Sequence, residues 1–137
     1  MNVLIVDDTA MVRVLVKRNL IALGLRAEEI LEAEDGEKGL ARFKTFQCRG
    51  IITDMRMPVM DGLEFVKEVR KLDCEVPIVM LTSANDREDV VAAIESGVND
   101  YLIKPFAPGD IKKKLRKMLA QMQQLADPQK QLTTCGL

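Results

Sequence analysis

The sequence predicts a single α/β domain with a parallel sheet of five strands and five helices. Short apolar runs, typical of strands buried on both faces, alternate along the chain with segments whose apolar residues recur every three or four positions. Such a β–α alternation is typical of a parallel sheet covered by helices on both faces. The length of 137 residues suits one domain, and 47% hydrophobic residues can supply a packed core.

The first half of the chain is expected to hold three strands and two helices. Its first strand is a continuous apolar run that ends at two acids, and the helix after it carries apolar residues at helical spacing as far as Gly24, a common residue just past a helix end. The second strand has the weakest pattern of the five. The expected strands lie at residues 3–6, around residues 30–31 and at residues 50–53, and the expected helices span residues 12–23 and begin at residues 35–36.

The second half is expected to hold two strands and three helices. Asp61 is a candidate N-cap for the first of these helices, and Asn85 followed by Glu88 resembles a capping box for the next, which Gly97 would close. The expected strands lie at residues 76–81 and 101–103, and the helices carry apolar residues over 65–72, 90–94 and 111–122.

The last residues of the chain show no periodicity. They contain glutamine, threonine and glycine without an apolar stripe, as is common in loose chain ends. We therefore expect one domain over residues 1–124 and a flexible C-terminal tail over residues 125–137.

Composition excludes several classes of function. Twenty basic residues nearly balance 21 acidic ones, so we expect no direct binding to nucleic acid. The chain has no histidine, which excludes histidine acid–base catalysis and histidine metal sites. The first apolar run is too short for a signal peptide or a membrane span, so no membrane insertion is expected. Three widely separated cysteines without a C-x-x-C argue against a disulfide framework and for a cytoplasmic location.

Acidic residues follow two of the predicted strands. Asp7 and Asp8 end the first strand, and Asp54 ends the third. In the common flavodoxin-like strand order 2-1-3-4-5 these two strands are neighbours, and their carboxyl ends lie at the sheet edge where α/β proteins bind ligands. Thr82 and Lys104 end the fourth and fifth strands and are expected at the same edge. The sequence thus predicts three carboxylates beside a hydroxyl and an ammonium.

Such a group of acids needs a compensating charge. Two carboxylates about 4 Å apart repel by roughly 4 kcal/mol at an effective dielectric constant of about 20. A Mg²⁺ ion binds one or two carboxylates, keeps several waters and leaves room for a phosphate oxygen. Lys104 offers a compact positive charge to a phosphoryl group, and Thr82 offers a hydroxyl donor.

Each of these residues also has an ordinary structural explanation. Asp7 and Asp8 could cap the first helix, Thr82 and Ser83 could be turn residues, and Lys104 could be a solvated surface lysine. Only their joint occurrence at four strand ends favours a functional site.

Four motifs in these positions resemble the receiver domain of two-component response regulators, above all single-domain regulators of the chemotaxis type. The similarity runs from about residue 2 to residue 122, in the order and spacing of that family. The motifs are residues 4–8 (LIVDD), Asp54 followed by Pro58 and Asp61-Gly62, residues 82–84 (TSA), and residues 101–106 (YLIKPF).

The resemblance implies a phosphoacceptor that uses Mg²⁺. Asp54 would accept a phosphoryl group from the phosphohistidine of a sensor kinase or a phosphotransfer protein. Mg²⁺ would be held by Asp8 and Asp54, by Asp7 through water, and by the main-chain carbonyl of Arg56. The protein would then be a switch that assists its own phosphotransfer and dephosphorylation, rather than a conventional enzyme.

The resemblance also implies a switching mechanism. Lys104 would contact the phosphoryl oxygens, Thr82 would move to bind them, and Tyr101 would turn inward. The surface of the fourth helix, fifth strand and fifth helix would change and bind a downstream protein that the sequence does not identify. In that family the Lys104–Pro105 bond is cis. The residues expected to border the phosphoryl group are Met55, Arg56, Ser83 and Ala84, of which Arg56 and Ala84 occupy variable positions.

Two other classes of protein share parts of this pattern. A phosphatase of the haloacid-dehalogenase type also uses an aspartate nucleophile and Mg²⁺, but it needs a second aspartate where this chain has Arg56. A flavodoxin-like nucleotide or flavin carrier needs a phosphate loop rich in glycine or serine after the first strand, where this chain has Asp7-Asp8-Thr9.

Two further groups of residues admit two interpretations each. A basic cluster on the last helix is either a solvated face or a docking site for an acidic partner. Three methionines near Asp54 either pack internally or form an adaptable docking surface. The basic cluster consists of Lys112, Lys113, Lys114, Arg116 and Lys117, and the methionines are Met55, Met57 and Met60.

Overall fold

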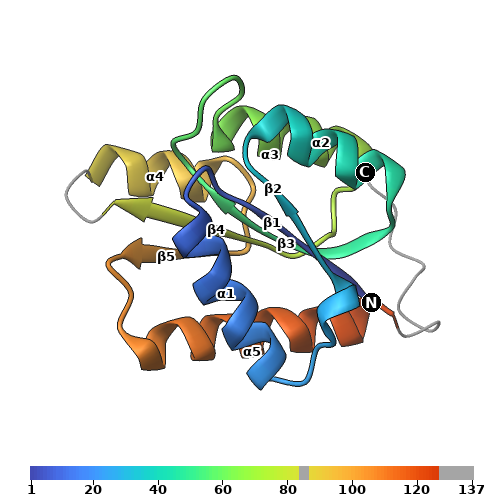
Figure 1. Cartoon of the computed structure of the whole chain (residues 1–137). Helices are drawn as coiled ribbons and strands as arrows, with labels where there is room; N and C mark the ends of the chain where they lie inside the picture. The colour runs from blue at the N-terminus through green and yellow to red at the C-terminus, as the bar shows by residue number, and fades with distance from the viewer. Residues whose placement is uncertain (84–86, 127–137) are drawn as a thin grey trace.

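The computed structural model of the chain describes residues 1–83 and 87–126. Within these residues, five strands alternate with five α-helices, and one 3-10 helix precedes the second strand (Figure 1). The strands are β1 (Asn2–Val6), β2 (Ile30–Ala33), β3 (Cys48–Asp54), β4 (Ile78–Ser83) and β5 (Asp100–Lys104). The helices are α1 (Ala10–Ala22), η1 (Ala27–Glu29), α2 (Gly36–Thr45), α3 (Gly62–Leu72), α4 (Arg87–Glu95) and α5 (Pro108–Leu125).

All five strands are parallel and follow the order β2-β1-β3-β4-β5, which confirms the predicted fold class. The central pair β1 and β3 aligns Val6 with Thr53, and β3 and β4 align Asp54 with Leu81. This register brings the ends of β1, β3 and β4 to the same edge of the sheet.

The sheet has a separate apolar core on each face because successive strand residues point in opposite directions. In β1 and β3, Leu4 and Ile51 belong to one core, whereas Ile5 and Ile52 belong to the other. Helices α2, α3 and α4 lie on one side of the sheet, and α1 and α5 lie on the other (Figure 1). Full burial of a large aliphatic or aromatic side chain contributes about 1.5–3 kcal/mol, so these two cores dominate stability.

The helix boundaries follow local chemistry. The side chain of Asp35 accepts a hydrogen bond from the N–H of Lys38 at 2.8 Å, and that of Asp61 accepts one from Glu64 at 2.9 Å, so the predicted cap at Asp61 is confirmed. Gly97 has a φ of +100°, the left-handed conformation that suits glycine after a helix. The proposed capping box at Asn85 lies outside the described residues.

The side chains of Asp7 and Asp8 do not act as the N-cap of helix α1. Its N-cap residue is Thr9, which makes no side-chain cap hydrogen bond. Asp7 Oδ1 accepts a hydrogen bond from the N–H of Thr9 at 2.8 Å, one residue before the helix. The acids at the end of β1 therefore do not cap α1 in the usual sense, and the carboxylate of Asp8 is left for another role.

The structure also bears on the predictions about membrane spans, cysteines and the C-terminal tail. None of the described helices is long and apolar enough to span a bilayer. Cys48 is buried and free, and burial raises the pKa of its thiol to about 11. Cys74 is disulfide-bonded, whereas the cysteine spacing argues against a disulfide framework. Helix α5 continues to Leu125, and the rest of the predicted tail, from residue 127, lies outside the described residues.

Candidate functional site

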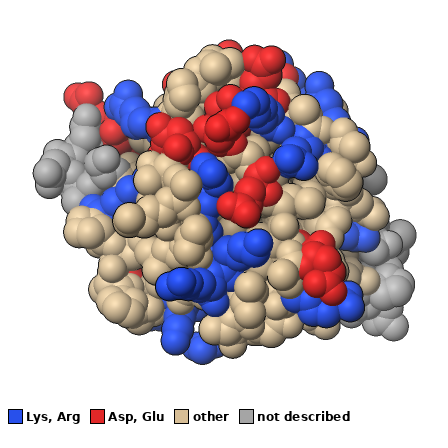
Figure 2. All heavy atoms as spheres, in the orientation of Figure 1, with Lys and Arg blue, Asp and Glu red and all other residues tan. Residues whose placement is uncertain are grey.

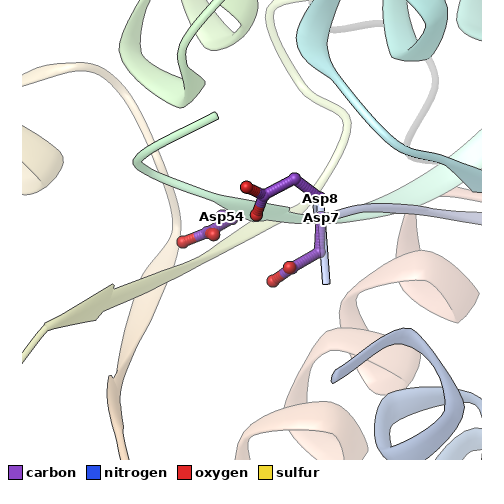
Figure 3. A group of neighbouring side chains, drawn as sticks. All are labelled: Asp7, Asp8 and Asp54. Atoms are coloured by element: carbon purple, nitrogen blue, oxygen red, sulfur yellow. The ribbon is translucent and has the colours of Figure 1, made fainter. Parts of the chain in front are cut away.

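Three carboxylates meet at the carboxyl edge of the sheet. Asp7 and Asp8 directly follow β1, and Asp54 is the last residue of β3 (Figure 3). One oxygen from each side chain lies within 4.8 Å of the others, an arrangement that could hold a metal ion. The structure thus brings together the three acids that the sequence predicts to converge.

The three acids differ in exposure. Asp7 is fully buried, Asp54 is only 7% exposed, and Asp8 is exposed. Burying a charged carboxylate is costly unless an opposite charge or hydrogen bonds compensate it. The cluster therefore consists of two buried acids and one acid on the solvent side of the site. A cation or a phosphoryl group can enter from that side.

Lys104, the last residue of β5, supplies part of the compensation. Its ammonium Nζ lies 3.3 Å from Asp7 Oδ2 and 3.2 Å from Asp54 Oδ2. One positive charge thus contacts two buried carboxylates, and the three acids together still carry an excess of negative charge. The donor set of three carboxylates fits a hard divalent cation such as Mg²⁺.

The electrostatic surroundings of Asp54 reflect this excess. Burial, and next the charge of Asp7, raise the pKa of Asp54 above its ordinary value. Lys104 and the N–H of Met55, which donates to Asp54 Oδ1 at 2.8 Å, act in the opposite direction. The ionised form of Asp54 is therefore destabilised in the metal-free protein, and a bound cation would relieve that destabilisation.

The backbone after Asp54 folds tightly around the site. The N–H of Gly62 donates to the carbonyl of Met55 at 2.8 Å, which returns the loop to the end of β3. A Cβ atom at position 62 would lie 2.0 Å from the carbonyl oxygen of Asp54, so only glycine fits there. The Asp61-Gly62 pair thus has two functions, since Asp61 caps α3 and Gly62 allows the close approach.

Thr82 and Tyr101 lie on the neighbouring strands. Thr82 is buried near the end of β4, and among the described residues its hydroxyl donates to one weak acceptor, Met55 Sδ, at 3.8 Å. Tyr101 lies on β5 and is half-buried, with the ammonium of Lys114 5.6 Å from its ring centroid. Ser83 pairs with Lys104 in the β4–β5 register, and Ala84 lies outside the described residues.

The loop after Asp54 contains both packed and exposed side chains. Met55 is buried, and Met57 and Met60 pack against the core between the sheet and helices α2 and α3, which favours the packing interpretation of these methionines. The side chain of Arg56 is largely exposed, and its Nη2 lies 2.7 Å from Asp89 Oδ1 on α4. No sequence pattern signals this ion pair, because its partners lie 33 residues apart.

Arg13 is a second residue near the site that sequence reasoning misses. From α1, its Nη1 donates to the carbonyl oxygen of Asp7, and its Nε lies 3.2 Å from Glu32 Oε1 on β2. It holds the end of β1 against β2. An arginine inside a helix gives no sign in the sequence of a contact with the end of a separate strand.

Comparison with known proteins agrees with this geometry. The model of the response regulator receiver domain matches residues 3–116. This chain belongs to that family. The Lys104–Pro105 bond is cis, as the family resemblance implies. Receiver domains are phosphoacceptor switches of two-component systems rather than conventional enzymes, and they bind Mg²⁺ through acidic residues of the kind found here.

Similar proteins include chemotaxis regulators of about the same length. The chemotaxis protein CheY1 of Helicobacter pylori is 38% identical over 122 residues, which cover 87% of this chain and 97% of that protein. A CheY homolog of Campylobacter jejuni is 39% identical over 122 residues, or 87% of this chain and 92% of that protein. The structure of CheY4 from Vibrio cholerae superposes with a TM-score of 0.76 at 36% identity, covering 85% of this chain and 97% of that one.

Membership of the family decides between the interpretations of the sequence. Neither a haloacid-dehalogenase phosphatase nor a flavodoxin-like carrier is a receiver domain, so both alternatives are set aside. A receiver domain implies a sensor kinase as a partner and a downstream target, and the similar proteins include chemotaxis regulators.

Proposed function

We propose that Asp54 accepts a phosphoryl group from the phosphohistidine of a sensor kinase or phosphotransfer protein in a Mg²⁺-dependent reaction. The observation that carries the proposal is that Asp54 combines contact with Lys104 and some access to solvent. Asp7 also contacts Lys104 but is fully buried, and Asp8 is exposed but has no contact with Lys104 among the described residues. Asp54 is therefore the best-placed nucleophile of the three.

The transfer itself needs little from the protein except position and charge. A phosphorus–oxygen bond forms at an Asp54 oxygen while the phosphorus–nitrogen bond of the donor histidine breaks, and the pair of electrons returns to the imidazole. Phosphoryl transfer depends on positioning and on stabilisation of the charge at the equatorial oxygens, so the absence of histidine from this chain is no obstacle.

Mg²⁺ and Lys104 would share that stabilisation. Asp8 and Asp54 would bind the cation directly, Asp7 through water, and Arg56 through its main-chain carbonyl. When bound, Mg²⁺ would neutralise charge on the cluster and on the phosphoryl oxygens. Lys104 already lies 3.2 Å from Asp54 Oδ2 and would follow the negative charge from the carboxylate to the phosphoryl group.

Thr82 and Tyr101 would convert the modification into a change of surface. Within the described part of the chain, the acceptor of the Thr82 hydroxyl is a sulfur atom at 3.8 Å, so a phosphoryl oxygen offers it a stronger hydrogen bond. Movement of Thr82 toward Asp54 would open space for Tyr101 to turn inward from β5. The surface formed by α4, β5 and α5 would then differ between the two states and bind the downstream protein.

The decisive experiment is labelling followed by mapping. The protein is incubated with a phosphohistidine donor and Mg²⁺, and the base-labile acyl phosphate is located by peptide analysis. Asp54→Asn should abolish labelling, whereas Asp61→Asn, which keeps a capping side chain in the same loop, should retain it. Undiminished labelling of Asp54→Asn would refute the assignment of the acceptor.

A further inference from the structure

Tyr101 lies on a strand at the edge of the sheet. β5 is the last strand in the order, and Leu102 is buried in the core on the side of α1 and α5. Because the side chains of a strand alternate between its two faces, Asp100 lies on the same face as Leu102, and Tyr101 lies on the opposite face. The strand thus directs an acid toward α5 and a half-buried tyrosine away from it.

An ion pair joins helix α5 to the start of β5. The ammonium Nζ of Lys114 lies 2.7 Å from Asp100 Oδ1, and the two side chains are 33% and 15% exposed. The same carboxylate oxygen accepts a hydrogen bond from the N–H of Tyr101 at 2.9 Å. A carboxylate that is partly shielded from solvent and also bonded to the backbone holds its cation more firmly than a fully exposed one. Asp100 therefore gives the ammonium of Lys114 a defined position.

That position is beside the ring of Tyr101. The ammonium of Lys114 lies 5.6 Å from the ring centroid, within the range of about 6 Å in which a cation is attracted to an aromatic face. Asp100 thus fixes both the backbone from which the ring projects and the cation beside the ring. If the ring turned inward while Asp100 kept Lys114 in place, the contact would be lost. The contact therefore stabilises one position of the ring and not the other.

The charges of α5 favour this arrangement. The helix carries five basic residues and a single acid, Asp110. Lys and Arg side chains gather over the lower part of the molecule, where Figure 1 places α1 and α5 (Figure 2). Like charges repel one another, so an acid on the adjacent strand attracts the nearest ammonium groups. Lys117 also pairs with Asp100, at 3.9 Å from Oδ2, but it is 64% exposed, and within the described residues the cation beside the Tyr101 ring is that of Lys114.

We propose that Lys114 is a positioning residue of the switch. Held by Asp100, it stabilises Tyr101 in its outward position and so sets how often the ring turns inward before phosphorylation. The inference rests on the proposed function, in which an inward Tyr101 accompanies the modification of Asp54. Lys114 acts through the ring alone, because its ammonium contacts Asp100 and Tyr101 and not the acidic cluster. Loss of a partly exposed cation–π contact should raise the inward population about two- to fivefold.

A purely structural role of Lys114 has a different consequence. The pair with Asp100 joins α5 to β5, so its loss could loosen both elements whichever way the ring points. Such loosening would lower the melting temperature without changing the neighbours of the Tyr101 ring. The test must therefore measure the position of the ring itself.

Nuclear magnetic resonance of the full chain provides that measurement. Tyr101 is the chain's only tyrosine, so isotope-labelled tyrosine gives signals from this ring alone. In the inward position the ring approaches the methyl group of Thr82, and the nuclear Overhauser effect between them rises with the inward population. The measurement is made in Asp54→Asn protein, in which phosphorylation plays no part. Addition of Lys114→Gln should increase the effect about two- to fivefold, the range of an exposed cation–π contact.

Two matched variants isolate the contact with the ring. Lys114→Arg keeps a cation that can pair with a carboxylate and stack on an aromatic ring, so it should retain the parent's effect. Lys117→Gln makes the same change in charge as Lys114→Gln and also removes a partner of Asp100, but it should leave the ring in place. An equal increase in Lys117→Gln would overturn the proposal, because the charge of α5 would then be the cause. No increase in Lys114→Gln that is folded by circular dichroism would overturn it as well.

Labelling of Asp54 separates this inference from the function on which it rests. Coupling between two equilibria is reciprocal, so with Asp54 intact Lys114→Gln should be labelled more fully than the parent at a limiting concentration of phosphohistidine donor. Labelling no greater than that of Lys117→Gln would overturn the link between Lys114 and the site. Complete absence of labelling in the parent would refute the phosphoacceptor proposal, whereas the ring measurement in Asp54→Asn protein would still decide the role of Lys114.

Discussion

At Val59 the backbone has a φ of +70°, in the left-handed region that β-branched residues rarely adopt. The N–H of Met60 donates to the carbonyl of Pro58 at 2.8 Å, which closes a tight turn around Val59. The side chain is 74% exposed, so little packing offsets the strain, which costs about 1–3 kcal/mol at such positions. The strain lies in the loop that leads from Asp54 to α3.

Relief of this strain gives a test. Asparagine adopts positive φ more readily than valine, so Val59→Asn should raise the free energy of unfolding by about 1 kcal/mol. Urea denaturation of parent and variant measures the change. The control Val91→Asn alters an exposed valine inside α4, where no strain is relieved, and it should not stabilise the protein. Equal or lower stability of Val59→Asn would show that the turn is not strained in solution.

Asp8 is the member of the acidic cluster that can be removed without leaving a buried charge unpaired. Asp8→Ala should raise the melting temperature of the metal-free protein, because it relieves repulsion with Asp7 and Asp54. Millimolar Mg²⁺ should raise the melting temperature of the parent but not of the variant. Glu37→Ala, outside the cluster on α2, should keep the parent's response to Mg²⁺. Indifference of the parent to Mg²⁺ would mean that the cluster is not a metal site.

The raised pKa of Asp54 predicts a pH dependence with a definite sign. A carboxyl group whose pKa is higher in the folded state binds more protons there, so stability falls as pH rises from the ordinary value of 3.8 through the folded-state pKa. In the presence of a chelator, Asp54→Asn should therefore be more stable than the parent at pH 7 and lose that advantage near pH 4. Urea denaturation at the two pH values measures the difference. A constant advantage across this range would assign it to packing rather than to charge.

At the scale of elements, the ion pair between Arg56 and Asp89 joins the loop after β3 to helix α4. A long cation two residues after the acceptor can pair with phosphoryl oxygens or hinder the water that hydrolyses the acyl phosphate. Arg56→Ala should therefore shorten the lifetime of phospho-Asp54, with little change in Mg²⁺ affinity because the metal would use only the carbonyl. Decay of labelled protein after removal of the donor measures the lifetime. Unchanged decay would mean that the contact with Asp89 keeps Arg56 away from the phosphoryl group.

The elements also show what the sequence could and could not predict. The cap at Asp61 was predictable because an N-cap acts on residues two or three positions later, within the reach of a local pattern. The contacts of Arg56 with Asp89 and of Arg13 with Asp7 were not predictable. Each contact joins two separate elements, and only the finished fold brings those elements together. The disulfide bond of Cys74 was not predictable from the cysteine spacing, which says nothing of distances between loops.

At the scale of the whole molecule, the order of strands and the meeting of three acids followed from a single regularity. Parallel strands have their carboxyl ends at one edge, so residues far apart in sequence were predictable neighbours once the alternation was recognised. Differences in burial among Asp7, Asp8 and Asp54 were not predictable, because they depend on how loops cover that edge. The roles of these residues, and the boundary between residues 124 and 125, remain predictions.

A signal must also travel from Asp54 to the outer surface. Tyr101 is the chain's only tyrosine and there is no tryptophan, so intrinsic fluorescence reports this residue alone. Phosphorylation should change its emission as the ring leaves Lys114 and turns inward. Thr82→Ala should be labelled at Asp54 yet show a smaller change, because the proposed link between Asp54 and Tyr101 is broken. Unaltered emission in labelled parent protein would argue against a rotating tyrosine.

The alternation of β3 between two cores limits how this chain can change by insertion or deletion. Ile51 and Ile52 serve opposite layers of the sheet, so loss of one residue inside β3 would exchange their layers and turn Asp54 to the other face. A residue gained in the surface turn at Gly24, between α1 and η1, disturbs no such alternation. Related chains should therefore vary in length at their surface turns and keep β3 at constant length.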